Sequence, residues 1–204
     1  MKIIAVGWNY QAHNKELDNP LLPKEPTIFL KPDSALLKDG KPFFLPDFSS
    51  RIEYEAELVV RISRLGKNIA TRFASRYYDA VTVGIDFTAR DIQQKMRSEG
   101  GPWDISKGFD SSAVIGEFIP IAESGLPGAT EFALSINGNE VQRGITSDMI
   151  FGIDEIISYV SRFYTIKTGD LIYTGTPQGV GPVKIGDHLE GYIGTRKLLD
   201  FYVR

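Results

Sequence analysis

Short apolar runs separated by turn residues dominate the pattern along the chain, and they predict mostly β-strands. The clearest runs occupy residues 2–6, 27–32, 51–60 and 81–86. Asn137-Gly138 stands inside residues 133–142, and this dipeptide predicts a β-hairpin there. Asp39-Gly40 predicts another tight turn for the same reason. The pattern therefore indicates a succession of short strands.

Apolar residues at helical spacing mark three further segments as helices. The predicted helices span residues 71–80, 89–99 and 147–163. Thr71, Thr88 and Ser147 are suited to cap their N-termini, because a hydroxyl oxygen can accept a hydrogen bond from a free backbone N–H. Gly100 and Gly101 are expected to end the second helix.

These helices do not alternate regularly with the strands, which disfavours a doubly wound parallel sheet. The pattern instead predicts a mixed α+β, β-rich fold in one domain over residues 1–204, since the chain has no repeat and no evident linker. Residues 10–17 are expected to form a loop or a short helical turn. A loop punctuated by Pro20, Pro23 and Pro26 follows.

The amino-acid composition is that of an ordinary globular protein, and it argues against several functional classes. The hydrophobic fraction is 42% and the charged fraction 24%. A net charge of -3 without a basic run gives no support for nucleic-acid binding, and no apolar stretch is long enough to cross a membrane. The lack of cysteine excludes disulfides and fits a reducing cytoplasm. Because the whole sequence contains two histidines and no cysteine, any metal site must rely mainly on oxygen ligands.

Residues 51–60, RIEYEAELVV, carry acidic residues at every second position of an otherwise apolar strand. Glu53, Glu55 and Glu57 therefore share one face. One interpretation is a half-exposed strand whose charges face water. The other is a metal site, because a divalent cation would remove the repulsion between neighbouring carboxylates.

Asp86 is the candidate for a third acidic ligand. It ends the apolar strand at residues 81–86, and strand ends that open into loops often carry functional groups. It could equally be a cap for the helix that follows. Glu55, Glu57 and Asp86 together would suit a hard cation such as Mg²⁺ or Mn²⁺.

Polar residues elsewhere could supply acid–base chemistry or bind an anion. His13 and Glu16 would lie on one side of a helical turn, so that the carboxylate could orient the imidazole. Lys107 could stabilise a developing oxyanion if its loop folds over the metal. Arg90 and Gln93 share a helix face, and an arginine is suited to binding carboxylates. Each of these side chains could also be an ordinary surface group.

Residues 174–182, TGTPQGVGP, are rich in glycine but lack the Gly-Lys-Ser/Thr ending of a phosphate loop. They could form only a set of tight turns. Alternatively, Thr176 and neighbouring backbone N–H groups could line an anion pocket. His188, in GDHLEG, is expected at the surface.

Taken in order, these segments resemble the fumarylacetoacetate hydrolase family almost from end to end. The matching segments are GWNYQAH, TIFLKP, EYEAELVV, GIDFTARDIQ, SKGFD, TSDMIF and TGTPQGVGPV. The resemblance is to the short, single-domain branch. It implies a fumarylacetoacetase C-terminal-like mixed β-sandwich roll with a few helices, commonly a homodimer. The segment before His13 has no carboxylate, whereas longer relatives carry a fourth acidic ligand there.

The resemblance also implies roles for individual residues. Glu55, Glu57 and Asp86 would bind a divalent metal, usually Mg²⁺ or Mn²⁺, and Glu53 would lie at the rim or in solvent. His13 and Glu16 would be a catalytic pair on a lid-like segment, and Lys107 would lie in the pocket. The substrate would be contacted by Arg90, Gln93 and Thr176.

The implied activity is metal-dependent chemistry on small 2-oxo acids through a metal-bound enolate. Hydrolysis of a carbon–carbon bond in acylpyruvates and decarboxylation of oxaloacetate are the leading expectations. Isomerisation of 2-hydroxyhepta-2,4-diene-1,7-dioate or 5-carboxymethyl-2-hydroxymuconate is the alternative. Two further classes compete: a non-enzymatic β-rich module with a structural Ca²⁺ site, and a glycosidase with two carboxylates.

Overall fold

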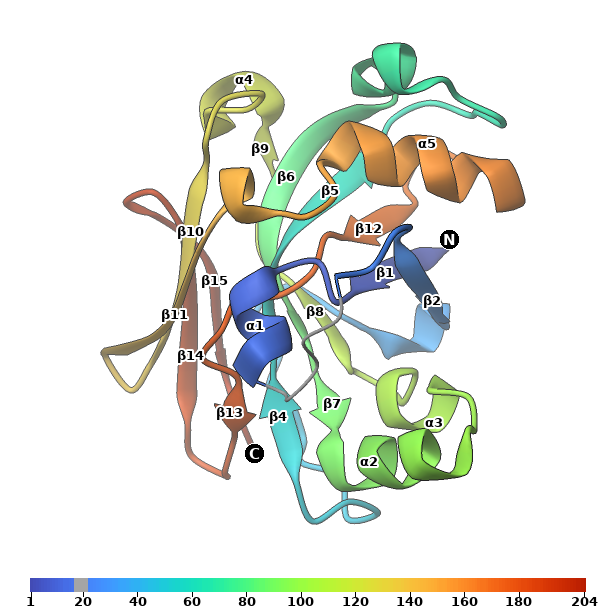
Figure 1. The fold of residues 1–204 in the computed structure, drawn as a ribbon. Helices are drawn as coiled ribbons and strands as arrows, with labels where there is room; N and C mark the ends of the chain where they lie inside the picture. Colours follow the sequence, from blue (N-terminus) through green and yellow to red (C-terminus); the bar gives the residue numbers. More distant parts are fainter. Residues whose placement is uncertain (17–21) are drawn as a thin grey trace.

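A computed structural model of the chain describes residues 1–16 and 22–204, and a large curled sheet forms its centre (Figure 1). Most neighbouring strands in this sheet are antiparallel, while β1–β12 and β3–β8 are parallel. Its eight strands, in spatial order with β9 pairing on β6, are β2 (Thr27–Lys31), β1 (Ile3–Gly7), β12 (Leu171–Tyr173), β5 (Ala56–Ile62), β6 (Tyr78–Asp86), β8 (Ala113–Ile115), β3 (Leu36–Leu37) and β9 (Ile119–Pro120).

Two smaller sheets accompany the large one, and Figure 1 shows the longer of them standing at its left side. The four-stranded sheet consists of β11 (Asn139–Ile145), β10 (Glu131–Ile136), β14 (His188–Ile193) and β15 (Arg196–Tyr202). The three-stranded sheet consists of β13 (Gly181–Pro182), β4 (Ile52–Tyr54) and β7 (Thr88–Ala89).

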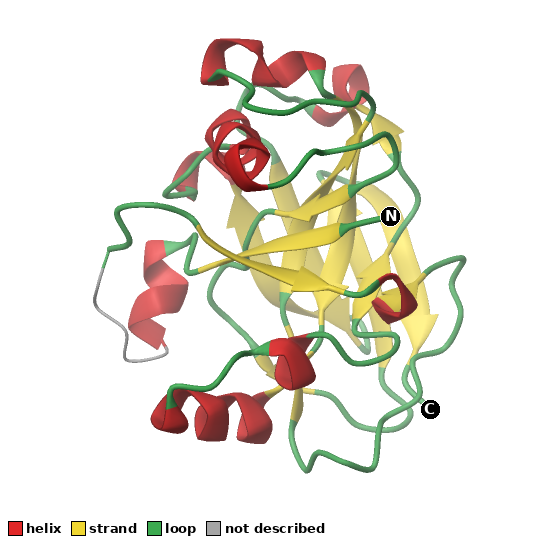
Figure 2. Cartoon of the chain, turned by 90° about the vertical axis from the view of Figure 1, so that its right-hand side faces the viewer, coloured by secondary structure: helices red, strands yellow, loops and turns green. Residues whose placement is uncertain are grey.

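The helices lie around the sheets, as Figure 2 shows from the side. The α-helices are α1 (Gln11–Glu16), α2 (Arg90–Glu99), α3 (Asp104–Lys107), α4 (Ile121–Ser124) and α5 (Ile153–Phe163). Short 3₁₀ segments cover Asp33–Ala35, Thr71–Arg76 and Thr146–Asp148. Within the two described ranges, no helix has both the length and the apolar character that crossing a membrane requires.

Both faces of β5 and β6 are buried, which explains why their sequences are nearly continuous apolar runs. One face joins the four-stranded sheet in the larger core, through Leu58, Val83, Leu134 and Phe201 among others. The other face contributes Val59 to a smaller core with residues of β1, β8 and β12. The mixed α+β, β-rich prediction is confirmed, and Glu57 of β5 and Asp86 of β6 lie inside the protein.

The hairpin at Asn137-Gly138 is confirmed, because both residues have positive φ angles, 52° and 78°, as a type I′ turn requires. The predicted helix over residues 71–80 is wrong beyond Arg76. There, β6 begins at Tyr78 because it pairs with β5, and this long-range pairing outweighs the local helical pattern. Leu17 and Pro20, in the expected turn and loop near the N-terminus, lie outside the described residues.

Two helices begin later than expected from the capping residues Thr88 and Ser147. Thr88 does not cap α2, because it pairs with β4 as part of β7. Ser147 lies in a 3₁₀ segment, and α5 starts only after Gly152. The Glu155 side chain accepts a hydrogen bond from the Gly152 N–H at 2.8 Å and so satisfies one free donor at this helix start.

Gly84→Ala is expected to lower the free energy of unfolding by about 1–3 kcal/mol, the usual cost of overpacking a filled core. Gly84 lies on β6 two residues before Asp86, and an added Cβ would come within 2.7 Å of both the Val114 carbonyl oxygen and Val59 Cγ2. Urea denaturation of the two proteins measures the difference. An unchanged midpoint would mean that the sheet moves apart there without cost.

Candidate metal and active site

Three buried carboxylates meet where β5 begins and β6 ends. Glu55 lies between β4 and β5, Glu57 is the second residue of β5, and Asp86 is the last residue of β6. The Asp86 N–H donates to the Glu55 carbonyl at 2.8 Å, and Glu57 lies opposite Gly84, so strand pairing brings the three together. One oxygen from each carboxylate lies within 4.8 Å of the others. The half-exposed strand is therefore the wrong interpretation of residues 51–60.

Lys107, the last residue of α3, projects into this acidic cluster. Its Nζ lies 2.8 Å from Glu55 Oε2, 2.7 Å from Asp86 Oδ2 and 2.6 Å from Thr88 Oγ1. Its side chain is 3% exposed, so the ammonium is a buried charge with three oxygen partners. The expectation that its segment folds over the carboxylates agrees with this geometry, although the segment is a helix rather than a loop.

Lys31, at the end of β2, is a second buried cation that the sequence analysis missed. Its Nζ lies 2.5 Å from Asp86 Oδ1 and donates hydrogen bonds of 3.0 Å to the carbonyl and Oγ of Ser112. A lone lysine at the end of the apolar strand TIFLKP was the available signal. Asp86 is thus held from both sides, by Lys31 on one oxygen and by Lys107 on the other.

Arg90 connects the cluster to α2. Its guanidinium donates to Glu53 Oε2 at 2.6 Å, to Glu55 Oε1 at 2.6 Å and to Gln93 Oε1 at 2.5 Å. Glu53 is only 2% exposed, so its expected place at the rim or in solvent is wrong. The reason is the ion pair with Arg90, to which the exposed Arg51 adds a second at 2.6 Å.

The surroundings shift the pKa values of Glu55 and Glu57 in opposite directions. Burial alone would raise the pKa of Glu55, but Lys107 and Arg90 outweigh it and hold that pKa below its ordinary value. Burial, followed by the charges of Asp86 and Glu55, raises the pKa of Glu57 well above its ordinary value. Among the described residues, Glu57 forms no ion pair, and its hydrogen bond comes from the Gly175 N–H at 2.5 Å.

The same balance acts on the buried cations. Burial lowers the pKa of Lys31, and the attraction of Asp86 does not compensate for it. For Lys107, Asp86 and Glu55 together outweigh burial and raise the pKa of the ammonium. Lys107 is therefore the firmer positive charge beside the carboxylates.

α1 places His13 at the cavity that contains the three carboxylates, and Glu16 lies beside His13 on the same helix. His13 Nδ1 lies 3.2 Å from Glu16 Oε2, in the contact that the three-residue spacing predicts. The Gly179 N–H donates to both oxygens of Glu16, at 3.0 and 3.2 Å, and so connects α1 to residues 174–182. His13 is buried and lines the cavity with Thr176, Gln93 and Lys107.

Thr176 reaches the same cavity from the glycine-rich segment. Its Oγ1 accepts a hydrogen bond of 2.9 Å from Gln142 Nε2, while Gln142 Oε1 accepts one of 2.9 Å from the Ala56 N–H. Gln142 therefore fixes this segment against the start of β5. Its role was not foreseen, because it lies in a hairpin far along the chain and only the tertiary fold brings it here.

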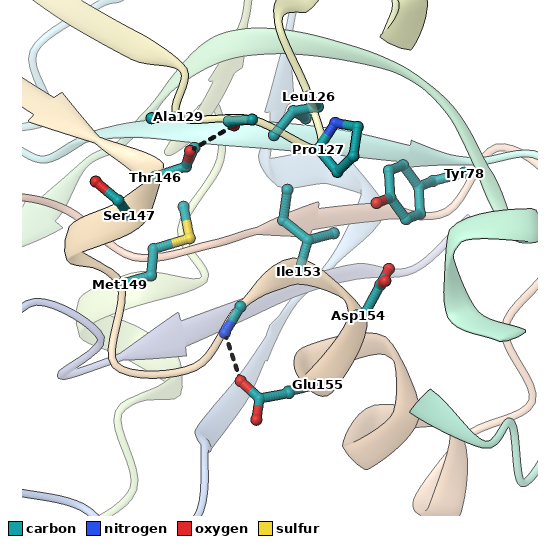
Figure 3. A pocket seen from close by; sticks show the side chains of 12 residues that line it. Tyr78, Leu126, Pro127, Ala129, Thr146, Ser147, Met149, Ile153, Asp154 and Glu155 are labelled. Carbon is teal, nitrogen blue, oxygen red and sulfur yellow. Dashed lines mark hydrogen bonds between the residues drawn. The ribbon is translucent and has the colours of Figure 1, made fainter. Parts of the chain in front are cut away.

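Other hollows and clusters lack this concentration of buried charge. A hollow of about 250 Å³ next to the start of α5 is lined by Leu126, Pro127, Met149 and Ile153 among others and shares no lining residue with the acidic cavity (Figure 3). His188 is partly buried on β14, and its Nε2 lies 2.7 Å from Asp200 Oδ1. Lys197 Nζ donates hydrogen bonds to Asp200 of that pair and to the neighbouring Glu190.

The residues of the acidic cavity fit a hard divalent cation. Glu55, Glu57 and Asp86 offer three oxygen ligands, the type that Mg²⁺ and Mn²⁺ prefer. Glu57 in particular is a buried carboxylate whose ionised form needs a positive partner, and the described residues supply none in direct contact. The fold and this cluster define a protein with an internal oxygen-ligand site beside a histidine–glutamate pair.

Comparison with known proteins places the chain in a family. Residues 2–199 match the family described as Fumarylacetoacetate (FAA) hydrolase C-terminal, and the chain belongs to this family of enzymes. It is 40% identical over 189 residues to an oxaloacetate tautomerase of Escherichia coli, covering 92% of this chain and 86% of the relative. A mitochondrial oxaloacetate tautomerase of Mus musculus is 41% identical over 191 residues, covering 94% and 86%.

A solved structure gives the same fold with ligands present. It is fumarylpyruvate hydrolase from Pseudomonas aeruginosa in complex with Mn²⁺ and pyruvate. The TM-score is 0.93 and the identity 35%, covering 100% of this chain and 89% of that one. The predicted fumarylacetoacetase C-terminal-like fold is therefore confirmed.

Proposed function

We propose that this chain is a Mg²⁺- or Mn²⁺-dependent enzyme that forms the enolate of small 2-oxo acids. The observation that carries the proposal is the group of three buried carboxylates within 4.8 Å, of which Glu57 has no ion-pair partner among the described residues. The relatives named as oxaloacetate tautomerases and as a fumarylpyruvate hydrolase support 2-oxo acids as the substrate class. A structural Ca²⁺ site would leave the contact between the buried His13 and Glu16 without a role.

Glu55, Glu57 and Asp86 would hold the cation. When bound, the cation would act as a Lewis acid and stabilise the negative charge of an enolate, an effect worth several kcal/mol. Lys107 would stabilise the same developing charge from the side, because its ammonium is fixed by Glu55 and Asp86. Arg90, Gln93 and Thr176, which line the same cavity, would contact the substrate, and Arg90 is suited to its carboxylate.

His13 would be the general base, and Glu16 would orient it. Because Nδ1 faces Glu16, Nε2 is the nitrogen available to take a proton. With an acylpyruvate, His13 would activate water to attack the distal carbonyl, and cleavage of the carbon–carbon bond would give the pyruvate enolate and a carboxylic acid. With oxaloacetate, loss of CO₂ would give the same pyruvate enolate, whereas transfer of a proton from C3 to the 2-oxo oxygen would give the enol of oxaloacetate, which is tautomerisation.

The direct test is an assay of the purified protein against acetylpyruvate, oxaloacetate and 2-hydroxyhepta-2,4-diene-1,7-dioate, each with Mg²⁺ and with excess chelator. Turnover of at least one substrate with Mg²⁺, and its loss with chelator, is the expected result. Metal binding without turnover of any 2-oxo acid would contradict the proposal. The single domain over residues 1–204 remains a prediction. The homodimer also remains a prediction, and analytical ultracentrifugation of the purified protein would test it.

His13→Ala is expected to lower acylpyruvate hydrolysis by about 10²–10⁴-fold, the usual contribution of a general base. Oxaloacetate decarboxylation should fall less, because it needs no activated water. His188→Ala is the matched control, since His188 lies on β14 outside the acidic cavity and is the second histidine of the sequence. Equal losses in both reactions would argue against His13 as the base that activates water.

A further inference from the structure

Aromatic rings form part of the wall of the acidic cavity, and one of them, Phe29, lies 5.3 Å from the Lys107 ammonium. Trp8, Phe29 and Trp103 line it together with the polar residues, and its volume is about 20 Å³. A space of this size holds about one or two water molecules. Even a small 2-oxo acid therefore requires part of the wall to move before it can enter.

Trp8 is the aromatic residue of this wall that lies next to α1. It has a φ of 64°, an unfavourable conformation for a bulky residue, and it precedes α1. Its ring stacks on His13 at 6.3 Å, and the Arg97 guanidinium lies 4.9 Å from its centre. Trp8 is therefore packed between His13 of α1 and Arg97 of α2.

Trp103 is held in this wall by backbone hydrogen bonds and ring contacts. Its carbonyl accepts hydrogen bonds from the N–H groups of Ser106 and Lys107 at 3.0 Å, so it is bound to the short helix that carries Lys107. Its ring packs edge-on against Phe29, with centroids 5.8 Å apart. The ring also reaches β1, since a Cβ on Gly7 would lie 3.2 Å from it.

A second hollow of about 430 Å³ lies against the same two aromatic residues. Trp103 and Phe29 line both this hollow and the acidic cavity, and they are the residues that the two have in common. The outer hollow is also lined by Ile28, Leu30, Pro102 and Tyr164, so most of its side chains are apolar, while Thr27 and Asp104 are its polar members. Trp103 therefore stands between the cavity with the carboxylates and a larger apolar space.

We propose that Trp103, supported by Phe29, limits the length of the acyl group that this site accepts. This inference rests on the proposed function. With Trp103 present, the substrate must end close to the distal carbonyl, as acetylpyruvate and oxaloacetate do. Without its ring, the cavity opens into the apolar hollow, and longer aliphatic 3-acylpyruvates fit.

The test compares hydrolysis of acetylpyruvate and hexanoylpyruvate with Mg²⁺ present. Trp103→Ala is expected to raise the ratio of kcat/KM for hexanoylpyruvate to that for acetylpyruvate by about tenfold or more, the scale on which hydrophobic pockets discriminate between chain lengths. Trp103→Phe should raise it less. Phe163→Ala, which removes an exposed ring on α5, is the matched control and should leave the ratio unchanged.

Two further measurements separate the outcomes. Mn²⁺ affinity should be equal in all variants, and Trp103→Leu replaces the alanine variant if that protein does not fold. Inhibition by 2-oxooctanoate relative to pyruvate should strengthen in parallel with the ratio. An unchanged ratio, or a preference of the unmodified protein for hexanoylpyruvate, would overturn this inference and leave the proposed function standing. No turnover of any 2-oxo acid by the unmodified protein would overturn both.

Discussion

Glu57→Gln is expected to reduce turnover of 2-oxo acids by about 10²–10⁴-fold, because stabilisation of the enolate charge by a metal is worth several kcal/mol. The metal-free variant should be as stable as the unmodified chain. Glu57 is the member of the cluster that burial and its acidic neighbours drive towards the neutral form. A glutamine keeps the shape, and its carbonyl can still accept the hydrogen bond from Gly175. Its amide group can donate to the neighbouring carboxylates, so nothing buried loses a partner.

Calorimetric titration with Mn²⁺ and urea denaturation in chelator measure the two halves of this expectation. Mn²⁺ affinity should fall by about 100-fold or more. This exceeds the usual loss when a residue that only hydrogen-bonds to a metal ligand is replaced. Glu131→Gln at the exposed start of β10 is the control and should change neither quantity. Unaltered Mn²⁺ affinity in Glu57→Gln would remove Glu57 from the ligand set.

Glu55→Gln would be a poorer test, although the family motif gives both glutamates the same role. Glu55 neutralises Arg90 and Lys107, and its loss would leave two buried cations short of a partner. Breaking a buried ion pair in this way typically costs about 3–5 kcal/mol. Loss of activity in that variant could follow from unfolding alone.

The candidate ligands could be predicted from the sequence because local rules place them. Glu55 and Glu57 are two residues apart on a strand, and Asp86 ends a strand, so their faces and positions follow from periodicity. Their proximity then needs only that β5 and β6 pair. His13 and Glu16 likewise depend on a single helical turn.

The partners of these residues could not be predicted in the same way. Lys31, Glu53 and Gln142 look like ordinary polar residues in strands, and each acts through a contact with a distant part of the chain. Lys31 meets Asp86 only because β2 and β6 end near each other, and Gln142 meets Ala56 across 86 residues. Residues 71–80 have a helical pattern, yet strand pairing takes over from Tyr78.

Lys107→Met is expected to have the opposite effect on metal affinity from Glu57→Gln. The ammonium of Lys107 lies 2.8 Å from Glu55 and 2.7 Å from Asp86, so it competes with a dication for the same two carboxylates. Its removal should leave Mn²⁺ affinity equal or higher. Turnover should nevertheless fall by about 10²–10³-fold, because a fixed charge beside the developing oxyanion is lost.

Stability supplies the third measurement on Lys107→Met. In chelator, Glu55 and Asp86 would keep only Arg90 and Lys31 as partners, and the free energy of unfolding should fall by about 3–5 kcal/mol. Saturating Mn²⁺ should restore part of it, since a ligand that binds only the folded state stabilises that state. Lys197→Met on the exposed face of β15 should change none of the three quantities. Weaker Mn²⁺ binding in Lys107→Met would mean that the lysine positions the carboxylates for the cation instead of competing with it.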